Sequence, residues 1–460
     1  MEIKMATKQE IPMAILIGFL GFIAVSFFSV TAYAETAAKT PASSAQSSTG
    51  FGSGLSNVIS DFQAKLPAMF RELSPEDVGH KPRIKTHFAA TSSFTTDADL
   101  SKDKAQPAWL ARAATGLTLE MPIGDRLYTE VDYTFAYATA QGPHISENTF
   151  THNLSALARY TLTDATQLGL KHNIQWSQVP GAFKDYFTLS TTTAEVNHRF
   201  SDILSGYVQD TFQWFQDRSA NTSTRVNQEY IDNGVGSGLS YDVTDRITLK
   251  PSAVWNNRNF TQQNGKDYWQ VAYQLGAAYK LGSQTSLEAH FGHNFREFSR
   301  GFHRADNGLI YGVGIANNVT HKLSWHLNYD HSVVDTFDTN FLKNDGAEAT
   351  NLDNLDRNFR VMSSHRFGSG VKYNLNEKNM FALFGDVQLL NGRAQDNVIR
   401  GKSNDEITME LGPSYSFRIN KYLSLDFRYV FGRRFESEDS GAGRPSYTFQ
   451  KIGGGLSATI

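Results

Sequence analysis

Hydrophobic and polar residues alternate along most of the chain with a period of two. In one such run Trp269, Val271 and Tyr273 alternate with Gln270 and Gln274. Residues that alternate in this way occupy opposite faces of a β-strand, so each run predicts a strand with one apolar and one polar face. The runs extend for about 12 to 15 residues, whereas strands of globular proteins usually have about five or six. The pattern therefore predicts an all-β protein built from unusually long strands.

Tight turns and longer polar loops separate these runs, and the two kinds of connection alternate. Glycine, asparagine, aspartate and serine are frequent in the tight turns, as short hairpins require. The eight tight turns are centred on Gly124, Thr163, Ser201, Thr244, Gly282, Thr320, Asn376 and Asn420. They join sixteen strands, and one further strand on each side, at about 84–95 and about 446–460, gives about eighteen.

The spacing between tight turns, roughly 40 residues, is compatible with two architectures. A β-propeller blade has a similar length but divides it among four short strands. Here each interval holds two long strands, one short turn and one long loop, which is the asymmetry of outer-membrane barrels. We therefore predict a transmembrane antiparallel up-and-down β-barrel of about 18 strands, with a short N-terminal amphipathic helix. An even number of strands places both ends of the barrel on the periplasmic side.

Aromatic residues gather toward the two ends of the predicted strands. The tryptophans near the loop ends are Trp109, Trp176, Trp214, Trp255 and Trp269. The tyrosines near the tight turns are Tyr128, Tyr160, Tyr241, Tyr279, Tyr373 and Tyr422. Two aromatic girdles are expected where the rings meet lipid headgroups, so this segregation favours a membrane barrel.

The N-terminal region differs in composition from the rest of the chain. Lys4 and Lys8 precede an apolar run that ends at Val30, and residues 32–34, Ala-Tyr-Ala, match the site that a signal peptidase recognises. We expect residues 1–34 to be a signal peptide that directs export. The alternative is that the apolar run is retained as an N-terminal membrane anchor.

Three segments follow the expected signal peptide. Residues 35–54 are rich in Ala, Ser, Thr and Gly and predict a flexible linker. Residues 55–82 carry apolar side chains at helical spacing, interrupted near Pro67, and predict an amphipathic helical segment that lies in the periplasm or plugs the barrel. Residues 83–460 form the predicted outer-membrane barrel.

Composition and charge exclude several functions. The formal net charge of −3 argues against a nucleic-acid partner. The mean hydropathy of −0.39 argues against a bundle of transmembrane helices. The chain has no cysteine, which excludes disulfides, thiolate metal sites and cysteine nucleophiles.

Catalytic and cofactor motifs are absent from the sequence. There is no G-x-S-x-G or H-E-x-x-H motif, and the alternation points His290 and His293 to opposite faces of one strand. We therefore expect no enzymatic activity, no cofactor and no metal. Acidic residues in the loop after Asp335 could bind calcium, but they lack EF-hand spacing, and solvated loop charge is the simpler interpretation.

The stretch from Leu117 to Tyr133, followed by the stretch from His152 to Asp164, resembles the β-barrel porin family often encoded with exopolysaccharide systems. The similarity in pattern covers the whole barrel region. The resemblance implies an outer-membrane porin-like protein that the barrel assembly machinery inserts among outer-membrane lipid and lipopolysaccharide. Barrels of this kind commonly end on an aromatic residue, whereas this chain ends on Ile460.

The alternation assigns more cations than acids to the inward face of the predicted barrel. The residues expected to line the pore are Arg159, Lys171, Arg199, Arg246, Lys250, Lys280, Arg296, Arg418, Asp426 and Arg428. Rings of Arg and Lys favour anions in a pore, although the same residues could instead pair with acids across strands. We predict a bacterial outer-membrane channel for hydrophilic, particularly anionic, solutes or for export of acidic polysaccharide. The alternative is a non-conducting structural or adhesive barrel that acts through its external loops.

Overall fold

The computed structural model describes most of the predicted barrel and nothing before residue 82. The described ranges are 82–96, 107–141, 146–178, 186–218, 228–261, 267–298, 305–335, 359–394, 404–436 and 447–459. The expected signal peptide, linker and amphipathic helical segment therefore lie outside the described residues, as do Ile460 and the loop acids after Asp335. In the described ranges no helix is long and apolar enough to cross a membrane.

Eighteen strands form one antiparallel sheet, as the alternation predicts. They are β1 (Arg83–Thr95), β2 (Ala108–Ile123), β3 (Leu127–Gln141), β4 (Ser146–Thr163), β5 (Thr166–Gln178), β6 (Tyr186–Ser201), β7 (Leu204–Arg218), β8 (Gln228–Thr244), β9 (Ile247–Phe260), β10 (Tyr268–Lys280), β11 (Thr285–Phe298), β12 (Ala305–Asn318), β13 (Leu323–Asp335), β14 (Phe359–Asn374), β15 (Asn379–Ala394), β16 (Asn404–Arg418), β17 (Leu423–Glu436) and β18 (Tyr447–Thr459).

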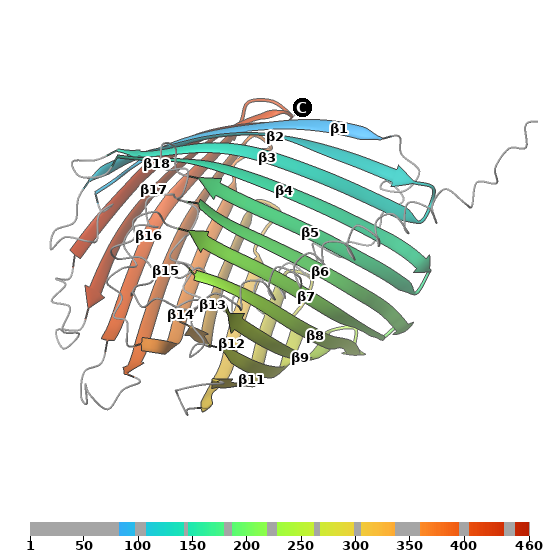
Figure 1. Cartoon of the computed structure of the whole chain (residues 1–460). Coiled ribbons are helices and arrows are strands. Elements are labelled where there is room, and N and C mark those ends of the chain that lie inside the picture. The colour runs from blue at the N-terminus through green and yellow to red at the C-terminus, as the bar shows by residue number, and fades with distance from the viewer. Residues whose placement is uncertain are drawn as a thin grey trace, which may run out of the picture.

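The first and last strands close the sheet into a barrel (Figure 1). β1 pairs with β18 in an antiparallel ladder in which Thr91 lies opposite Gly455, and every other strand pairs with its neighbours in sequence. Closure gives each strand two partners, so no backbone edge is left unpaired. The prediction of an all-β, closed, antiparallel up-and-down barrel is confirmed.

Tight turns occur at all eight predicted positions, and local hydrogen bonds explain why. The Asn376 Oδ1 atom accepts hydrogen bonds from the backbone N–H groups of Lys378 and Asn379, each at 2.9 Å. Asn420 makes the same contact with the N–H of Leu423 at 3.0 Å. Gly124 has a φ of 62°, a conformation that glycine adopts without steric cost. The two asparagine side chains accept hydrogen bonds from the backbone of their own turns and so promote these turns locally.

Alternation along each strand separates an inward face from an outward face. In β10, Gln270 and Gln274 face inward and are 1% and 5% exposed, whereas Tyr273 and Leu275 face outward and are 56% and 52% exposed. Exposed apolar side chains occur on the outward face all around the barrel, among them Phe88, Phe291, Leu411, Phe427 and Ile452. An apolar exterior on a closed barrel is the arrangement of a protein that spans a membrane.

Two inward-facing rings lie directly beside glycines of the neighbouring strand. A Cβ atom added to Gly238 of β8 would lie 2.6 Å from the ring of Tyr207 on β7. His87 on β1 covers Gly116 of β2 in the same way. In each pair the ring occupies the space that a side chain at the glycine would take. A side chain at either glycine would therefore collide with the ring beside it.

Candidate functional site

The barrel interior is the candidate functional site. Residues directly opposite one another in an antiparallel ladder share a face of the sheet. Lys250 lies opposite Gly276, and Gly276 lies opposite His290 on the next strand. All three line a cavity of about 830 Å³ on the side of the barrel formed by β5 to β13. The register therefore identifies the lumenal face of each strand.

Most of the residues expected to line the pore lie on this lumenal face. They are Arg159, Lys171, Arg199, Lys250, Lys280, Arg296, Arg418, Asp426 and Arg428. Arg246 is different, because it lies in the tight turn between β8 and β9 and not within a strand. The period-two assignment does not hold there, since the chain reverses direction.

The cavity lining includes two cationic side chains. Arg199 and Lys250 are exposed on the cavity wall, close to Tyr207 and Asn197. Among the described residues neither Arg199 nor Lys250 makes an ion pair. Both charges are therefore available to a solute in the cavity.

The strands that follow also carry lumenal carboxylates. The His290 Nε2 atom lies 3.6 Å from an Asp330 carboxylate oxygen, and the Arg366 Nη2 atom lies 2.6 Å from an Asp386 carboxylate oxygen. Glu410 lies directly opposite Asp386. Arg366 thus pairs with Asp386 beside a second carboxylate, that of Glu410.

Two neighbouring arcs of strands differ in the balance of their lumenal charges. The cation arc consists of Arg159, Lys171, Arg199, Lys250 and Lys280, on β4 to β10. The acid arc consists of Glu288, Asp330, Asp386 and Glu410, on β11 to β16. Each arc also contains lumenal charge of the other sign. Glu195, Asp232 and Asp242 lie on strands of the cation arc, and Arg296, Arg366, Lys372 and Arg418 lie on strands of the acid arc. Positive charge is therefore in excess along β4 to β10, whereas the two signs are nearly balanced along β11 to β16.

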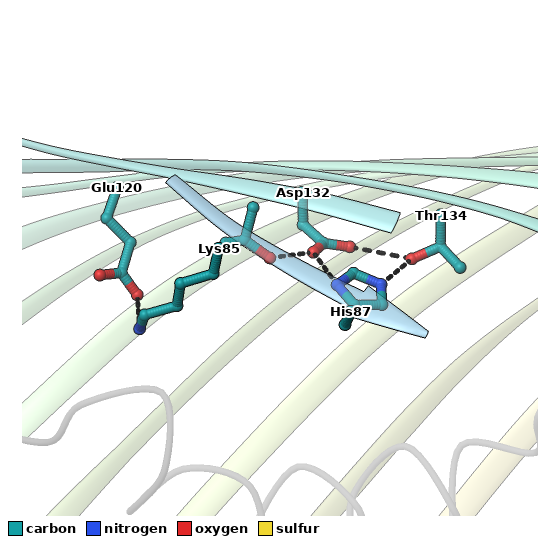
Figure 2. Close-up of polar contacts among 6 residues, drawn as sticks. Lys85, His87, Glu120, Asp132 and Thr134 are labelled. Atoms are coloured by element: carbon teal, nitrogen blue, oxygen red, sulfur yellow. Dashed lines mark hydrogen bonds and ion pairs between the residues drawn. The ribbon is translucent and has the colours of Figure 1, made fainter. Parts of the chain in front are cut away.

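A third polar group lies where the barrel closes (Figure 2). Lys85 of β1 forms an ion pair with Glu120 of β2. The His87 Nε2 atom is 3.0 Å from the Thr134 hydroxyl, and its Nδ1 atom is 3.9 Å from the Asp132 carboxylate. All five side chains extend from the inner surface of β1, β2 and β3, so the closing strands present a hydrogen-bonded polar surface to the lumen.

Sequence reasoning did not select Lys85, His87 or Glu120 as lining residues. The alternation alone could have assigned them to one face of their strands. Their mutual contacts, however, depend on the antiparallel pairing of β1 with β2, in which Lys85 lies opposite Thr118, two residues before Glu120 on the same face. Only the paired strands bring these charges together.

Toward the loop ends, the interior holds a buried cluster of arginines and rings. Arg258 bonds the Asp232 carboxylate through Nη2 at 2.7 Å and through Nε at 3.0 Å. Its guanidinium carbon lies 4.5 Å from the Tyr230 ring centroid and 5.5 Å from that of Tyr268. Arg258 is 2% exposed, so this charge is compensated inside the protein.

Arg296 belongs to the same cluster. Its Nε and Nη2 atoms donate to the Gln270 Oε1 atom at 3.0 and 2.8 Å, and its guanidinium lies over the Tyr268 ring at 4.4 Å. It is 1% exposed. Arg296 thus faces inward as expected, but its guanidinium is engaged by neighbouring side chains and is not open to a passing solute.

Metal binding has no support in the described strands and turns, where no group of three or more His, Asp or Glu side chains could hold an ion. The interior instead offers hydrogen-bond donors, acceptors and separated charges. Such a surface can hydrate and orient a polar solute.

Known proteins resemble this chain in three-dimensional structure and not in sequence. The sequence matches no protein-family model, and no curated protein matches it by sequence. Among solved structures, it is similar to OccK5 of Pseudomonas aeruginosa, with 9% identity, a TM-score of 0.48, and 82% of this chain and 98% of that chain covered. It is also similar to the siderophore receptor PirA of Pseudomonas aeruginosa, with 8% identity, a TM-score of 0.46, and 82% and 80% covered. Likenesses this distant carry no conclusion about the function of this barrel.

Proposed function

We propose that this protein is a bacterial outer-membrane channel that conducts hydrophilic solutes passively and favours anions. The observation that carries the proposal is the cavity wall on which Arg199 and Lys250 are exposed and make no ion pair with another described residue. Cations on the wall of a low-dielectric barrel raise the local concentration of anions.

The acid arc sets a limit on this preference. Glu288 and Asp330 line the same cavity as the two cations. A simple anion would follow the cation arc, whereas a larger polar molecule would contact both arcs. Acidic oligosaccharides combine hydroxyl groups with carboxylates and suit such a lining, in keeping with the resemblance to porins encoded with exopolysaccharide systems.

The apolar exterior supports residence in the outer membrane, in contact with lipid and lipopolysaccharide. Under this proposal residues 1–34 direct export, and the barrel assembly machinery inserts the folded strands. Export is tested by sequencing the N-terminus of the mature protein, which should begin at or near Glu35. An intact Met1 in the membrane-inserted protein would contradict removal of the segment.

Ion selectivity is the direct test of the channel. In a planar bilayer with a salt gradient, the unmodified protein should give a reversal potential of anionic sign. Replacing both Arg199 and Lys250 by Ser should shift that potential toward cations. Arg246→Ser is the matched control, because it removes one cation from a turn and should leave selectivity unchanged.

A non-conducting structural or adhesive barrel is the second candidate. The observation that favours it is the buried cluster around Arg258, Tyr268 and Arg296, which occupies the interior toward the loop ends. A folded, inserted protein with no measurable conductance would support this second candidate and exclude the channel.

A further inference from the structure

Asp210 lies on the outward face of β7, between the apolar neighbours of the adjoining strands. It is exposed, and the ladders place it opposite Ala194 of β6 and Val235 of β8. Among the strand side chains that the structure describes, the other charged ones on the outward face are Glu229, Glu297 and Arg433, and all three lie close to the loop ends. Asp210 is therefore an isolated acid in the middle of the membrane-facing surface.

A carboxylate at this position has an energetic cost, because lipid tails offer it no hydrogen bond. Within the described part of the chain, no hydrogen bond or ion pair reaches Asp210. Acidic residues within a membrane surface usually have a protein partner. A donor from outside this chain would remove the cost.

His172 lies at the same height on the outward face of β5. β5 begins at Thr166 and β7 begins at Leu204, both directly after tight turns at the same end of the barrel. His172 and Asp210 each lie six positions further along their strands. The His172 Nδ1 atom is 2.8 Å from the hydroxyl of Thr192, which leaves Nε2 to bond another group.

Ala194 lies between these two residues on β6. Its ladder partners are Leu170 on β5 and Asp210 on β7. Its side chain is small, and the outward residues next to it toward the tight turns, Val196 and Val208, are 44% and 56% exposed. This surface thus has the small side chain of Ala194 at its centre and apolar side chains beside it. The hydrogen-bond donor His172 lies on one side of Ala194, and the acceptor Asp210 lies on the other. We call His172, Ala194, Val196, Val208 and Asp210 the dimer patch.

We infer that the dimer patch binds a second copy of this chain across a twofold axis that runs beside Ala194. A twofold axis along the membrane normal preserves height and exchanges left and right. His172 of each copy then meets Asp210 of the other copy, and both contacts form at once. Charge complementarity at equal height favours a second copy over an unrelated partner, because one surface supplies both halves of the interaction.

The energetic logic follows from the surroundings. A hydrogen bond from His172 to an ionised carboxylate is stronger in a low-dielectric environment than in water. Ala194 lets the two barrels approach closely, as small residues do at contacts between membrane-spanning segments. The membrane-facing carboxylate of Asp210 gains a partner, and the apolar flanks exchange lipid for protein.

Cysteine crosslinking tests the inferred axis directly, since the chain contains no natural cysteine. Ala194→Cys should form a disulfide-linked dimer on mild oxidation in native outer membranes. Leu411→Cys is the matched control, because Leu411 of β16 faces outward and is 53% exposed on a distant arc of strands. No crosslink at position 194, or equal crosslinking at both positions, would overturn the inference. A crosslink from position 194 to a protein of another mass would also overturn it.

The pair itself is tested in the Ala194→Cys background. Asp210→Leu and His172→Leu should each reduce the crosslinked fraction strongly. Exchanging the two residues, with His172→Asp and Asp210→His together, should restore it, because the complementarity survives. Heat-modifiable gel migration confirms that each variant folds. Crosslinking by the two single variants at the unmodified level would show that the pair does not hold the copies together.

Discussion

Asp232 and Arg258 lie directly opposite one another on β8 and β9, and a 2.7 Å contact between the carboxylate and the guanidinium joins them inside the barrel. The side chains are 8% and 2% exposed. Such a buried pair contributes less to stability than its short distance suggests, because both charges lose hydration. Replacing only one of the two residues is nevertheless costly, because the charge of the other residue stays buried without a partner.

Asp232→Ala is therefore expected to destabilise the barrel by about 3–5 kcal/mol. The double variant Asp232→Leu, Arg258→Met should lose much less, because no unpaired charge remains. Urea unfolding in detergent, followed by tryptophan fluorescence, measures the free energy of unfolding. Equal losses in the single and double variants would contradict a compensated pair.

The contact between Tyr207 and Gly238 predicts that the stability of the barrel is sensitive to a side chain at position 238. Gly238→Ala places a Cβ atom 2.6 Å from the Tyr207 ring and should destabilise the barrel by about 1–3 kcal/mol. Gly236→Ala is the matched control, because its nearest contact is Val254 at 3.6 Å. The two free energies of unfolding should differ. Adding Tyr207→Ala to Gly238→Ala should recover part of the loss, and no recovery would exclude the ring as the obstacle.

The ion pair between Lys85 and Glu120 predicts a change in selectivity with little change in stability. The Lys85 side chain is 44% exposed, so solvent screens the pair, and Glu120→Gln should cost less than about 1 kcal/mol. The freed ammonium should shift the reversal potential further toward anions. An unchanged potential would show that Lys85 does not act on permeating ions.

The direction of the tight turns predicts the topology in the cell. A biotin-acceptor tag inserted after Asp345, in the long connection between β13 and β14, should be labelled on intact bacteria. The same tag at Asn420, in the turn between β16 and β17, should be labelled only after lysis. The opposite result, with label at Asn420 on intact bacteria and after Asp345 only on lysis, would show that the tight turns face outside and would contradict the predicted topology.

Deletion of residues 35–80 tests whether this segment plugs the barrel. Every ladder that closes the barrel lies at or beyond Arg83, so a deletion of residues 35–80 should leave the barrel folded by heat-modifiable migration. A rise in conductance would assign the segment to the lumen. Unchanged conductance would discard the plug and leave a periplasmic role.

Local chemistry in the sequence determined the strands, the turns and the direction of most side chains. Asn376 and Asn420 bond their own turns, and the period of two directs Arg199 and Lys250 inward whatever their neighbours are. A side chain's direction depends on its own backbone, which is why these predictions needed no tertiary information. Arg246 departs from them because it lies in a turn.

The tertiary structure decided which inward charges are available and which are compensated. Lys85 meets Glu120 only because β1 pairs with β2, and Arg296 is enclosed only because β10 brings Gln270 and Tyr268 beside it. The sequence alone shows Asp210 as a polar residue within a strand, and only the ladders place it opposite Ala194 on the outer surface. Register and closure join residues far apart in the chain, and a periodicity of two contains no information about which strand lies alongside.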